Sequence, residues 1–332
     1  MKKAEYASRG PVPQDLIACV DFELPAPAAD EVLIEVLAAP INPSDVLTIT
    51  GAYGMLPPLP AIGGNEGIGR IAARGDGVTS LSIGQRVLLP VGSGTWRTHM
   101  LAKAAELIAL PAVGDALQLS MLTVNPPTAS LLLSEFVTLE TGDWVIQNAA
   151  NSAVGSYLVQ LAKQRGLHTV NVVRRESAIA GVQAIGGDVV LLDGPDLAQR
   201  VEAATSKAKI KLGVDAVGGL STENIARSVR VGGTVVNYGG MSGMRCTIAP
   251  DAFIFRDVTL RGFWLAWWFR NSSTTVQQAL FAELTQHIVS GALFTKVAAT
   301  YLVDNIKNAM AAAVAGEREG KILLTPNGLI QP

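Results

Sequence analysis

Three small residues near the middle of the chain stand at a spacing suited to binding a phosphate group. Ala150, Ser152 and Gly155 occupy the positions of the fingerprint G-x-G-x-x-G, which holds the pyrophosphate of a dinucleotide at a helix N-terminus. Only the third glycine, which allows close packing of the helix on the strand, is present. The pattern is compatible with a dinucleotide site and also with an ordinary turn between a strand and a helix.

The end of the next expected strand indicates which dinucleotide would bind. About 20 residues beyond the fingerprint, enzymes that use NAD carry an Asp or Glu for the ribose 2′-hydroxyl. This chain has Arg174 and Arg175 there. Two guanidinium groups offer paired donors to a 2′-phosphate, so the sequence predicts NADPH. The alternative is a solvated basic pair that follows a strand.

The elements that must position these residues follow from the apolar pattern. Residues 144–147 form a short apolar run, residues 154–165 show helix spacing before Gly166, and residues 168–173 are apolar and β-branched. Together they have the length of a strand–helix–strand unit with parallel strands. The turn after residue 147 would then lie at the helix N-terminus, where a pyrophosphate binds.

The pattern differs between the two parts of the chain. Up to about residue 117 it predicts Gly- and Pro-rich turns and short strands, one of them at residues 95–101. Beyond that point strands alternate with helices, with a third strand at residues 189–192, which is typical of a parallel sheet. The segments after about residue 268 are expected to return to the first domain. We therefore predict an α/β protein with a β-rich domain of residues 1–117 and 269–332, and a doubly wound domain of residues 118–268.

The composition is that of a well-packed α/β protein. The chain has 332 residues, of which 49% are hydrophobic and 16% are charged, and its formal net charge is −2. This balance gives no general attraction to nucleic acid. No apolar run approaches about 18 residues, so no membrane span is expected.

The first residues and the cysteines bear on location. The start, MKKAEYASRGPVPQ, lacks the apolar segment of a secretory signal and is not rich enough in Arg and Ser for a transit peptide. Cys19 and Cys246 are too few for a disulfide scaffold and are compatible with a reducing compartment. We expect a cytoplasmic protein.

The sequence offers no metal site and no activated nucleophile. His99, His168 and His287 show no paired spacing, and two cysteines cannot form a four-cysteine zinc site. A nucleophile elbow of the type G-x-S-x-G is also missing from the sequence. A bound cofactor must therefore supply the difficult chemistry, while the protein supplies orientation and electrostatics.

Tyr53 is the candidate proton source. It stands in a loop, residues 51–64, that is rich in Gly and Pro and must follow a fixed path. A phenol with a pKa of about 10 can protonate an enolate at neutral pH, as hydride addition to a polarised C=C bond requires. The alternative is an aromatic ring packed on proline.

A series of short strings then occurs in order along nearly the whole chain. They are INPSD (41–45), YGMLPPLPAIGGNEG (53–67), LTVNPPTA (122–129), QNAANSAVG (147–155), NVVRR (171–175), NYGGMSG (237–243), IFRDVTLRGFWL (254–265) and GKILL (320–324). With these strings the chain resembles the medium-chain dehydrogenase/reductase superfamily. Within it, the chain is most similar to the zinc-free, NADPH-dependent 2-enoyl thioester reductases. Asn65 stands where zinc alcohol dehydrogenases have a histidine ligand.

The resemblance implies a GroES-like β-rich domain, a Rossmann coenzyme domain and roles for single residues. Tyr53 would be the catalytic proton donor, and Trp264 and Trp267 would wall the acyl pocket. Trp267 and Trp268 are bulky and would shorten that pocket. The coenzyme would lie against Asn125, Asn151, Ser152, Ala153, Val154, Arg174, Arg175, Tyr238, Gly239, Gly240, Met241, Phe263, Trp264, Leu265 and Lys321.

The implied reaction is the NADPH-dependent reduction of the C2=C3 bond of a trans-2-enoyl thioester of CoA or acyl carrier protein. An NADPH:quinone or alkenal reductase, and a catalytically silent NADPH-binding protein, are the alternatives. The resemblance also implies a homodimer that joins two sheets at one edge. That edge is expected at residues 232–238 or near residues 246–248.

Overall fold

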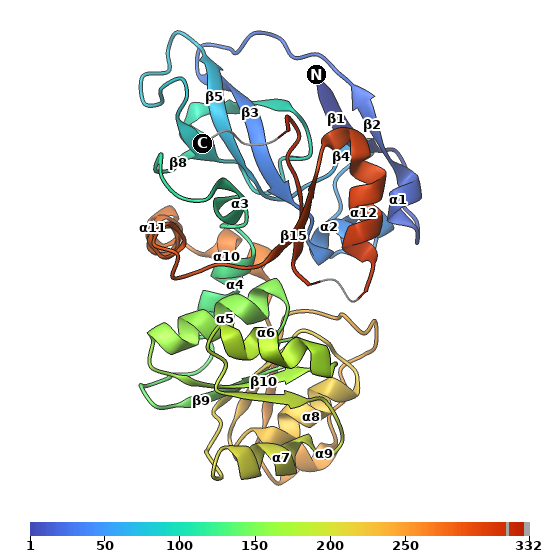
Figure 1. Cartoon of the computed structure of the whole chain (residues 1–332), viewed down its shortest axis with the longest axis vertical. Coiled ribbons are helices and arrows are strands. Elements are labelled where there is room, and N and C mark those ends of the chain that lie inside the picture. The colour runs from blue at the N-terminus through green and yellow to red at the C-terminus, as the bar shows by residue number, and fades with distance from the viewer. Residues whose placement is uncertain (317–318, 329–332) are drawn as a thin grey trace. The chain divides into compact units, whose positions relative to one another are not determined.

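The computed structural model describes residues 1–316 and 319–328. It divides into two compact units (Figure 1), the first made of Met1–Val124 and the described residues from Phe281 onward, and the second of Asn125–Leu280. The expected domains, residues 1–117 with 269–332 and residues 118–268, stay a prediction. No helix among the described residues combines the length and the apolar character needed to cross a bilayer.

The first unit is built on a mixed sheet with the strand order β15-β16-β3-β5-β6-β8, in which β7 also pairs with β3. Its strands are β3 (Glu31–Pro40), β5 (Ile68–Arg74), β6 (Arg86–Leu88), β7 (His99–Lys103), β8 (Ile108–Ala109), β15 (Val297–Tyr301) and β16 (Lys321–Leu324). A smaller antiparallel sheet has the order β2-β1-β4, with β1 (Lys2–Tyr6), β2 (Ile17–Asp21) and β4 (Ala61–Ile62). Burial alternates along β3 up to Val36, as in a strand with one face on the core.

The helices of the first unit are short. They are α1 (Pro13–Leu16), α2 (Pro43–Thr50), α3 (Ala116–Leu119) and α12 (Ile306–Val314), with 3-10 turns η1 (Ala104–Glu106) and η3 (Val303–Asn305). The longer helix α11 (Thr274–Val289) begins in the second unit and ends in the first. Asn42 and Asp45 form a capping box at the N-terminus of α2, which satisfies backbone N–H groups that the helix leaves unpaired.

The second unit is a parallel sheet with the order β11-β10-β9-β12-β13-β14. Its strands are β9 (Trp144–Gln147), β10 (His168–Val173), β11 (Val189–Leu192), β12 (Leu212–Asp215), β13 (Thr234–Asn237) and β14 (Thr259–Gly262). Numbered within the unit, this is the 3-2-1-4-5-6 order of doubly wound dinucleotide-binding folds. The order reverses between β9 and β12, and ligands of such folds bind at the carboxyl ends of the strands at that point.

Helices cover both faces of this sheet (Figure 1). Apolar side chains of α5 (Ala153–Gln164) and α6 (Ile179–Ala184) pack on one face, around the buried residues Val159, Val173 and Val182. The other face is covered by α7 (Leu197–Ala204), α8 (Leu220–Ser228) and α9 (Pro250–Ile254). The remaining elements are α4 (Asn125–Leu132), η2 (Glu176–Ala178) and α10 (Leu265–Asn271).

Two expectations about strands are wrong. Residues 232–238 do not form an edge, because β13 lies between β12 and β14, and residues 246–248 form no strand. The edge is β14. The strand expected from residue 95 begins only at His99. Before it, the buried Trp96 ring packs so closely on Gly63 that a Cβ there would lie 2.2 Å from the ring, which holds this stretch in an irregular path.

Candidate active site

The turn between β9 and α5 has the local geometry of a phosphate-binding turn. Ser152 is the N-cap of α5, and its Oγ accepts a hydrogen bond from the Gly155 N–H at 3.1 Å. A Cβ on Gly155 would lie 2.6 Å from the Ala150 carbonyl oxygen and 2.8 Å from that of Ala149. The third position of the fingerprint therefore needs glycine for the reason that the fingerprint gives, which is close packing of the helix on the turn.

A buried polar network fixes the strand ends around this turn. The Asn148 side chain donates to Asp215 Oδ1 at 2.6 Å and to Ser221 Oγ at 2.9 Å, and its oxygen accepts from the Ala216 N–H at 2.8 Å. The fully buried Asp215 also accepts from Asn237 Nδ2 at 2.9 Å. The carboxyl ends of β9, β12 and β13 are thereby tied together at the point where the strand order reverses.

Tyr238 follows β13 and joins the turn to this network. It is partly buried, its hydroxyl is hydrogen-bonded to the Ser152 side chain, and burial raises the pKa of the phenol. Next to it, a Cβ on Gly239 would lie 2.8 Å from the Ala216 carbonyl oxygen. The structure thus brings Ser152, Tyr238 and Gly239, all expected at the coenzyme, together at the carboxyl ends of the parallel strands.

The other expected coenzyme residues of the second unit differ in exposure. Asn151, Gly240 and Met241 are exposed, Ala153 is partly buried and Val154 is buried. Arg174 and Arg175 follow β10 directly, with Arg174 exposed and Arg175 partly buried. Among the described residues no carboxylate forms an ion pair with Arg174. Asn125 opens α4 and is buried.

The aromatic segment after β14 is only partly covered. The Phe263 N–H donates to the Asn237 carbonyl at 2.9 Å, and its ring meets Phe136 edge to face at 5.7 Å between centroids. Trp264 caps α10, where the Arg270 guanidinium lies 5.7 Å from its ring centroid. Trp267 is 61% exposed, which does not match a place in a core. Its expected role at the acyl pocket stays a prediction, as does that of Leu265.

In the first unit, Tyr53 lies partly buried just beyond α2. Gly51 ends that helix in the left-handed conformation, with φ of 86°, and the Tyr53 N–H donates to the Leu47 carbonyl at 3.1 Å. The Arg9 guanidinium donates to the Pro57 carbonyl of the same loop. Sequence patterns do not single out Arg9, because its partner lies 48 positions away.

Lys321 lies in a buried polar cluster of the first unit. Its Nζ donates to the Ile41 carbonyl at 3.1 Å and to Asn42 Oδ1. Nearby, burial raises the pKa of Asp45 to about 7, although the Asn42 N–H donates to its Oδ2 at 2.7 Å. The place of Lys321 at the ribose–phosphate side of the coenzyme stays a prediction.

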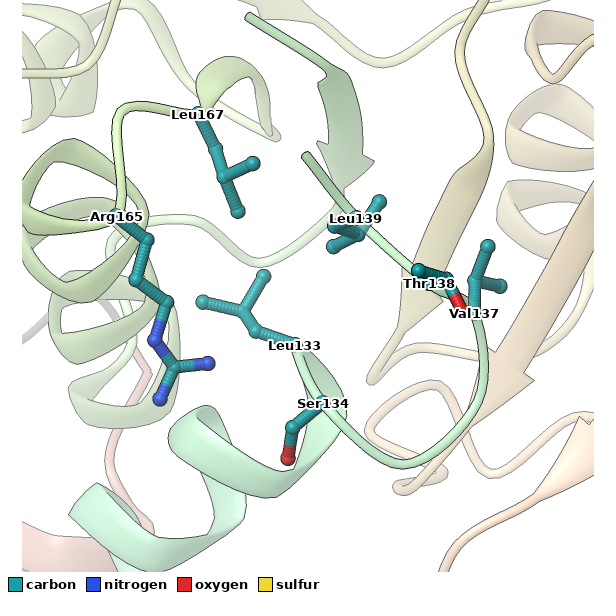
Figure 2. A pocket seen from close by; sticks show the side chains of 7 residues that line it. All are labelled: Leu133, Ser134, Val137, Thr138, Leu139, Arg165 and Leu167. Carbon is teal, nitrogen blue, oxygen red and sulfur yellow. The ribbon is translucent and has the colours of Figure 1, made fainter. Parts of the chain in front are cut away.

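The second unit also has a pocket, which Figure 2 shows from close by. Its volume is about 320 Å³, and Figure 2 shows Leu133, Leu139 and Leu167 with the Arg165 guanidinium around it. Arg165 follows the end of α5, whereas Ser152 is at its start. The pocket therefore lies at the amino ends of the parallel strands, whereas the turn lies at the carboxyl end of β9. No cluster of metal-ligating side chains was found among the described residues.

Comparison with known proteins places this architecture in a class. The family described as "Zinc-binding dehydrogenase" matches residues 153–282, and the "Alcohol dehydrogenase GroES-like domain" matches residues 28–112. Together with the doubly wound sheet, these matches define a medium-chain dehydrogenase/reductase. The α/β fold with a GroES-like part and a Rossmann part is confirmed.

Full-length relatives narrow the class. The mitochondrial enoyl-[acyl-carrier-protein] reductase of Mus musculus is 36% identical over 331 residues, which is 96% of this chain and 87% of the relative. The human enzyme of the same name is 35% identical, over 94% of this chain and 86% of its own length. The chain belongs to the family of these enoyl reductases, which confirms the resemblance and the assignment to the oxidoreductases.

Solved structures agree in fold. A complex of Etr1p with NADP and crotonyl-CoA is 28% identical, with a TM-score of 0.88 and coverage of 98% of this chain and 99% of the other. A Bacillus thuringiensis protein described by the name NADPH:quinone reductase is also 28% identical, with a TM-score of 0.89 and 98% coverage of both chains.

The expected cytoplasmic location is wrong by the same comparison. The curated relatives from mouse, rat, human and Arabidopsis thaliana are mitochondrial proteins by name. The composition of the first residues was compared with a secretory signal and with an Arg- and Ser-rich transit peptide. A mismatch with these two kinds of leader segment does not define the compartment in which a protein works.

Proposed function

We propose that this chain reduces the C2=C3 bond of trans-2-enoyl thioesters with NADPH as coenzyme, the acyl group being carried by CoA or acyl carrier protein. The observation that carries the proposal is identity of 36% to an enoyl-[acyl-carrier-protein] reductase over 96% of the chain. The Etr1p complex, whose ligands are NADP and crotonyl-CoA, supports the same coenzyme and substrate class.

The residues of the second unit fit a dinucleotide. The helix N-terminus at Ser152 offers backbone N–H groups to a pyrophosphate. Gly155 and Gly239 leave space against backbone that any side chain would fill. Arg174 and Arg175 would meet the 2′-phosphate with charge-assisted hydrogen bonds. NADPH, when bound, supplies the hydride for the β-carbon of the thioester.

The residues of the first unit complete the reaction. Hydride addition leaves negative charge on the thioester enolate, which hydrogen-bond donors stabilise. The Tyr53 hydroxyl then gives the proton to the α-carbon, directly or through a water molecule. Because Gly51 and Arg9 fix the loop that follows α2, Tyr53 can present its hydroxyl from a defined position.

The experiment compares acceptors and one substitution. NADPH oxidation by the wild-type protein is measured with crotonyl-CoA and with a naphthoquinone. We expect turnover of crotonyl-CoA, and a kcat about 100-fold lower in Tyr53→Phe. Tyr301→Phe, which removes a phenol from β15 of the same unit, is the matched control and keeps full activity. An unchanged kcat in Tyr53→Phe would remove Tyr53 as proton donor.

A quinone or alkenal reductase is the second candidate, supported by the NADPH:quinone reductase among the similar structures. It predicts turnover of the naphthoquinone without turnover of crotonyl-CoA. A silent NADPH-binding protein predicts turnover of neither acceptor.

We also propose that two copies of the chain pair through β14. This strand is one of the two edges of the parallel sheet and is largely exposed, so its outer N–H and C=O groups can pair with another strand. Ile254 and Phe255, just before it, are 70% and 78% exposed in the single chain. Apolar side chains beside an open strand edge favour a second copy of the same chain.

A further inference from the structure

A buried carboxylate of the first unit has no role in the proposed chemistry. Glu66 is fully buried, and burial raises its pKa. Its Oε1 accepts from Asn42 Nδ2 at 2.7 Å, and its Oε2 accepts from the Val124 N–H at 2.9 Å. The N–H and the hydroxyl of Thr123 also donate to Oε2, both at 3.1 Å. Both carboxylate oxygens are therefore satisfied, which a buried charge requires.

The donors to Oε2 lie at a special place in the chain. Thr123 and Val124 are the last residues of the first unit before the chain enters the second at Asn125. Asn125 begins α4 and is followed by Pro126 and Pro127, which have no N–H to donate. The hydrogen bonds of Glu66 thus help to set the backbone course just ahead of Asn125.

We propose that Glu66 is a positioning residue for NADPH binding, acting through the backbone of Thr123 and Val124 on Asn125. The inference rests on the proposed function, in which Asn125 lies at the nicotinamide end of the coenzyme. A carboxylate that accepts both N–H groups holds this segment in one path, so that the Asn125 side chain is in place before the coenzyme binds. Preorganisation of this kind lowers the entropy cost of binding.

The site specifically needs a carboxylate. A glutamine at position 66 has one acceptor oxygen and one donor group. If its oxygen faced Thr123 and Val124, its NH₂ would face the Asn42 NH₂, and Asn42 would have to turn its oxygen away from Lys321. If its NH₂ faced Thr123 and Val124, donors would meet donors. Either arrangement disturbs the path toward Asn125 or leaves the Lys321 amine without its amide partner.

The test is a double-mutant cycle read by NADPH affinity. The Kd for NADPH is measured by nucleotide fluorescence for the wild type, Glu66→Gln, Asn125→Ala and the double variant. We expect Glu66→Gln to raise Kd about tenfold, as for a lost hydrogen bond to a charged group. In the Asn125→Ala background the same substitution should change Kd by less than about twofold.

Equal effects of Glu66→Gln in both backgrounds, or an unchanged Kd in the single variant, overturn the proposal. Thr123→Val, which removes one of the hydrogen bonds and keeps both N–H groups, serves if Glu66→Gln does not fold. It should raise Kd about threefold, again only when Asn125 is present, and an unchanged Kd overturns the proposal.

Two controls separate the possible causes. Ile71→Val shortens a buried side chain in another core cluster of the first unit, so it lowers Tm and leaves Kd unchanged. A rise in its Kd equal to that of Glu66→Gln would assign the effect to stability and overturn the proposal. NADPH binding needs no acyl substrate, so the two proposals can fail separately. If the double-mutant cycle gives the expected Kd values but the wild type does not turn over crotonyl-CoA, only the proposed function is refuted. A wild type that does not bind NADPH overturns both.

Discussion

Gly155→Ala tests whether the incomplete fingerprint works as a packed turn. A single methyl group would enter the contact between the first turn of α5 and the loop after β9. The added Cβ would lie 2.6 Å from the Ala150 carbonyl oxygen and 2.8 Å from the Ala149 carbonyl oxygen. Both neighbours are backbone atoms, so no side chain can rotate away. The helix must retreat from the turn by several tenths of an ångström.

The size of the effect follows from that geometry. Overpacking against rigid neighbours costs about 1–3 kcal/mol, and the gain in helix propensity from Ala over Gly offsets at most about 1 kcal/mol. For a domain of this size, about 1 kcal/mol shifts Tm by roughly 2–4 °C. With the full propensity gain the net cost is up to about 2 kcal/mol, so we expect Gly155→Ala to lower the Tm of the coenzyme-free protein by up to roughly 8 °C. It should also weaken NADPH binding, since the Ser152 N-cap moves with the helix.

The matched control is Gly181→Ala. Gly181 is also a helical glycine of the second unit, in α6, but a Cβ there would meet nothing within 4 Å. This substitution should raise Tm by roughly 1–3 °C through helix propensity alone. Thermal unfolding by circular dichroism and NADPH binding by fluorescence give both readouts. If Gly155→Ala raised Tm as Gly181→Ala does and left the Kd for NADPH unchanged, close packing of α5 on the turn would not be the reason for glycine at position 155.

Three further outcomes follow. Arg174→Ala combined with Arg175→Ala should raise KM for NADPH by about tenfold or more and leave KM for NADH nearly unchanged, and equal effects on both coenzymes would contradict the 2′-phosphate contact. Burial holds the pKa of Asp45 at about 7 in the folded protein against 3.8 as the ordinary value. The folded state then keeps a proton that the unfolded state loses, so this carboxyl makes stability fall as pH rises from 4 to 7. Asp45→Asn, which mimics the protonated acid, should therefore gain Tm relative to the wild type over that range, and a constant difference would refute the assignment. Gel filtration should give twice the chain mass of 34.7 kDa, and Phe255→Asp should shift it to the mass of one chain; a wild-type protein that elutes as one chain would contradict pairing through β14.

Local patterns predicted the elements of the second unit well. The strands expected at 144–147, 168–173 and 189–192 are β9, β10 and β11 with the same limits. Short apolar runs bounded by turn residues carry this information within a few residues. The βαβ alternation then specified a parallel sheet, because a helix must carry the chain back between parallel strands.

Contacts between distant residues left no such local signal. Asn148 and Asp215 lie 67 positions apart, and Glu66 and Thr123 lie 57 apart. Each is an ordinary polar residue in its local sequence, and only the fold shows that a buried donor meets a buried acceptor. The density of the aromatic run 263–269 suits either a core or a pocket. Trp267 is 61% exposed in the single chain, which does not match a core, and its role at a pocket stays a prediction.

The fingerprint itself shows why two of its glycines are dispensable here. The residue of the turn with positive φ is Ala149, at 48°, one position before the fingerprint begins. Ala150 needs no such conformation and is fully buried, so a methyl group there fills space that glycine would leave empty. Ser152 uses its hydroxyl as the N-cap of α5 and as a partner of Tyr238. Glycine at either position would lose these contacts. Since only Gly155 faces backbone that excludes a side chain, a motif search that weighs the three glycines equally discards the turn that we propose binds the pyrophosphate.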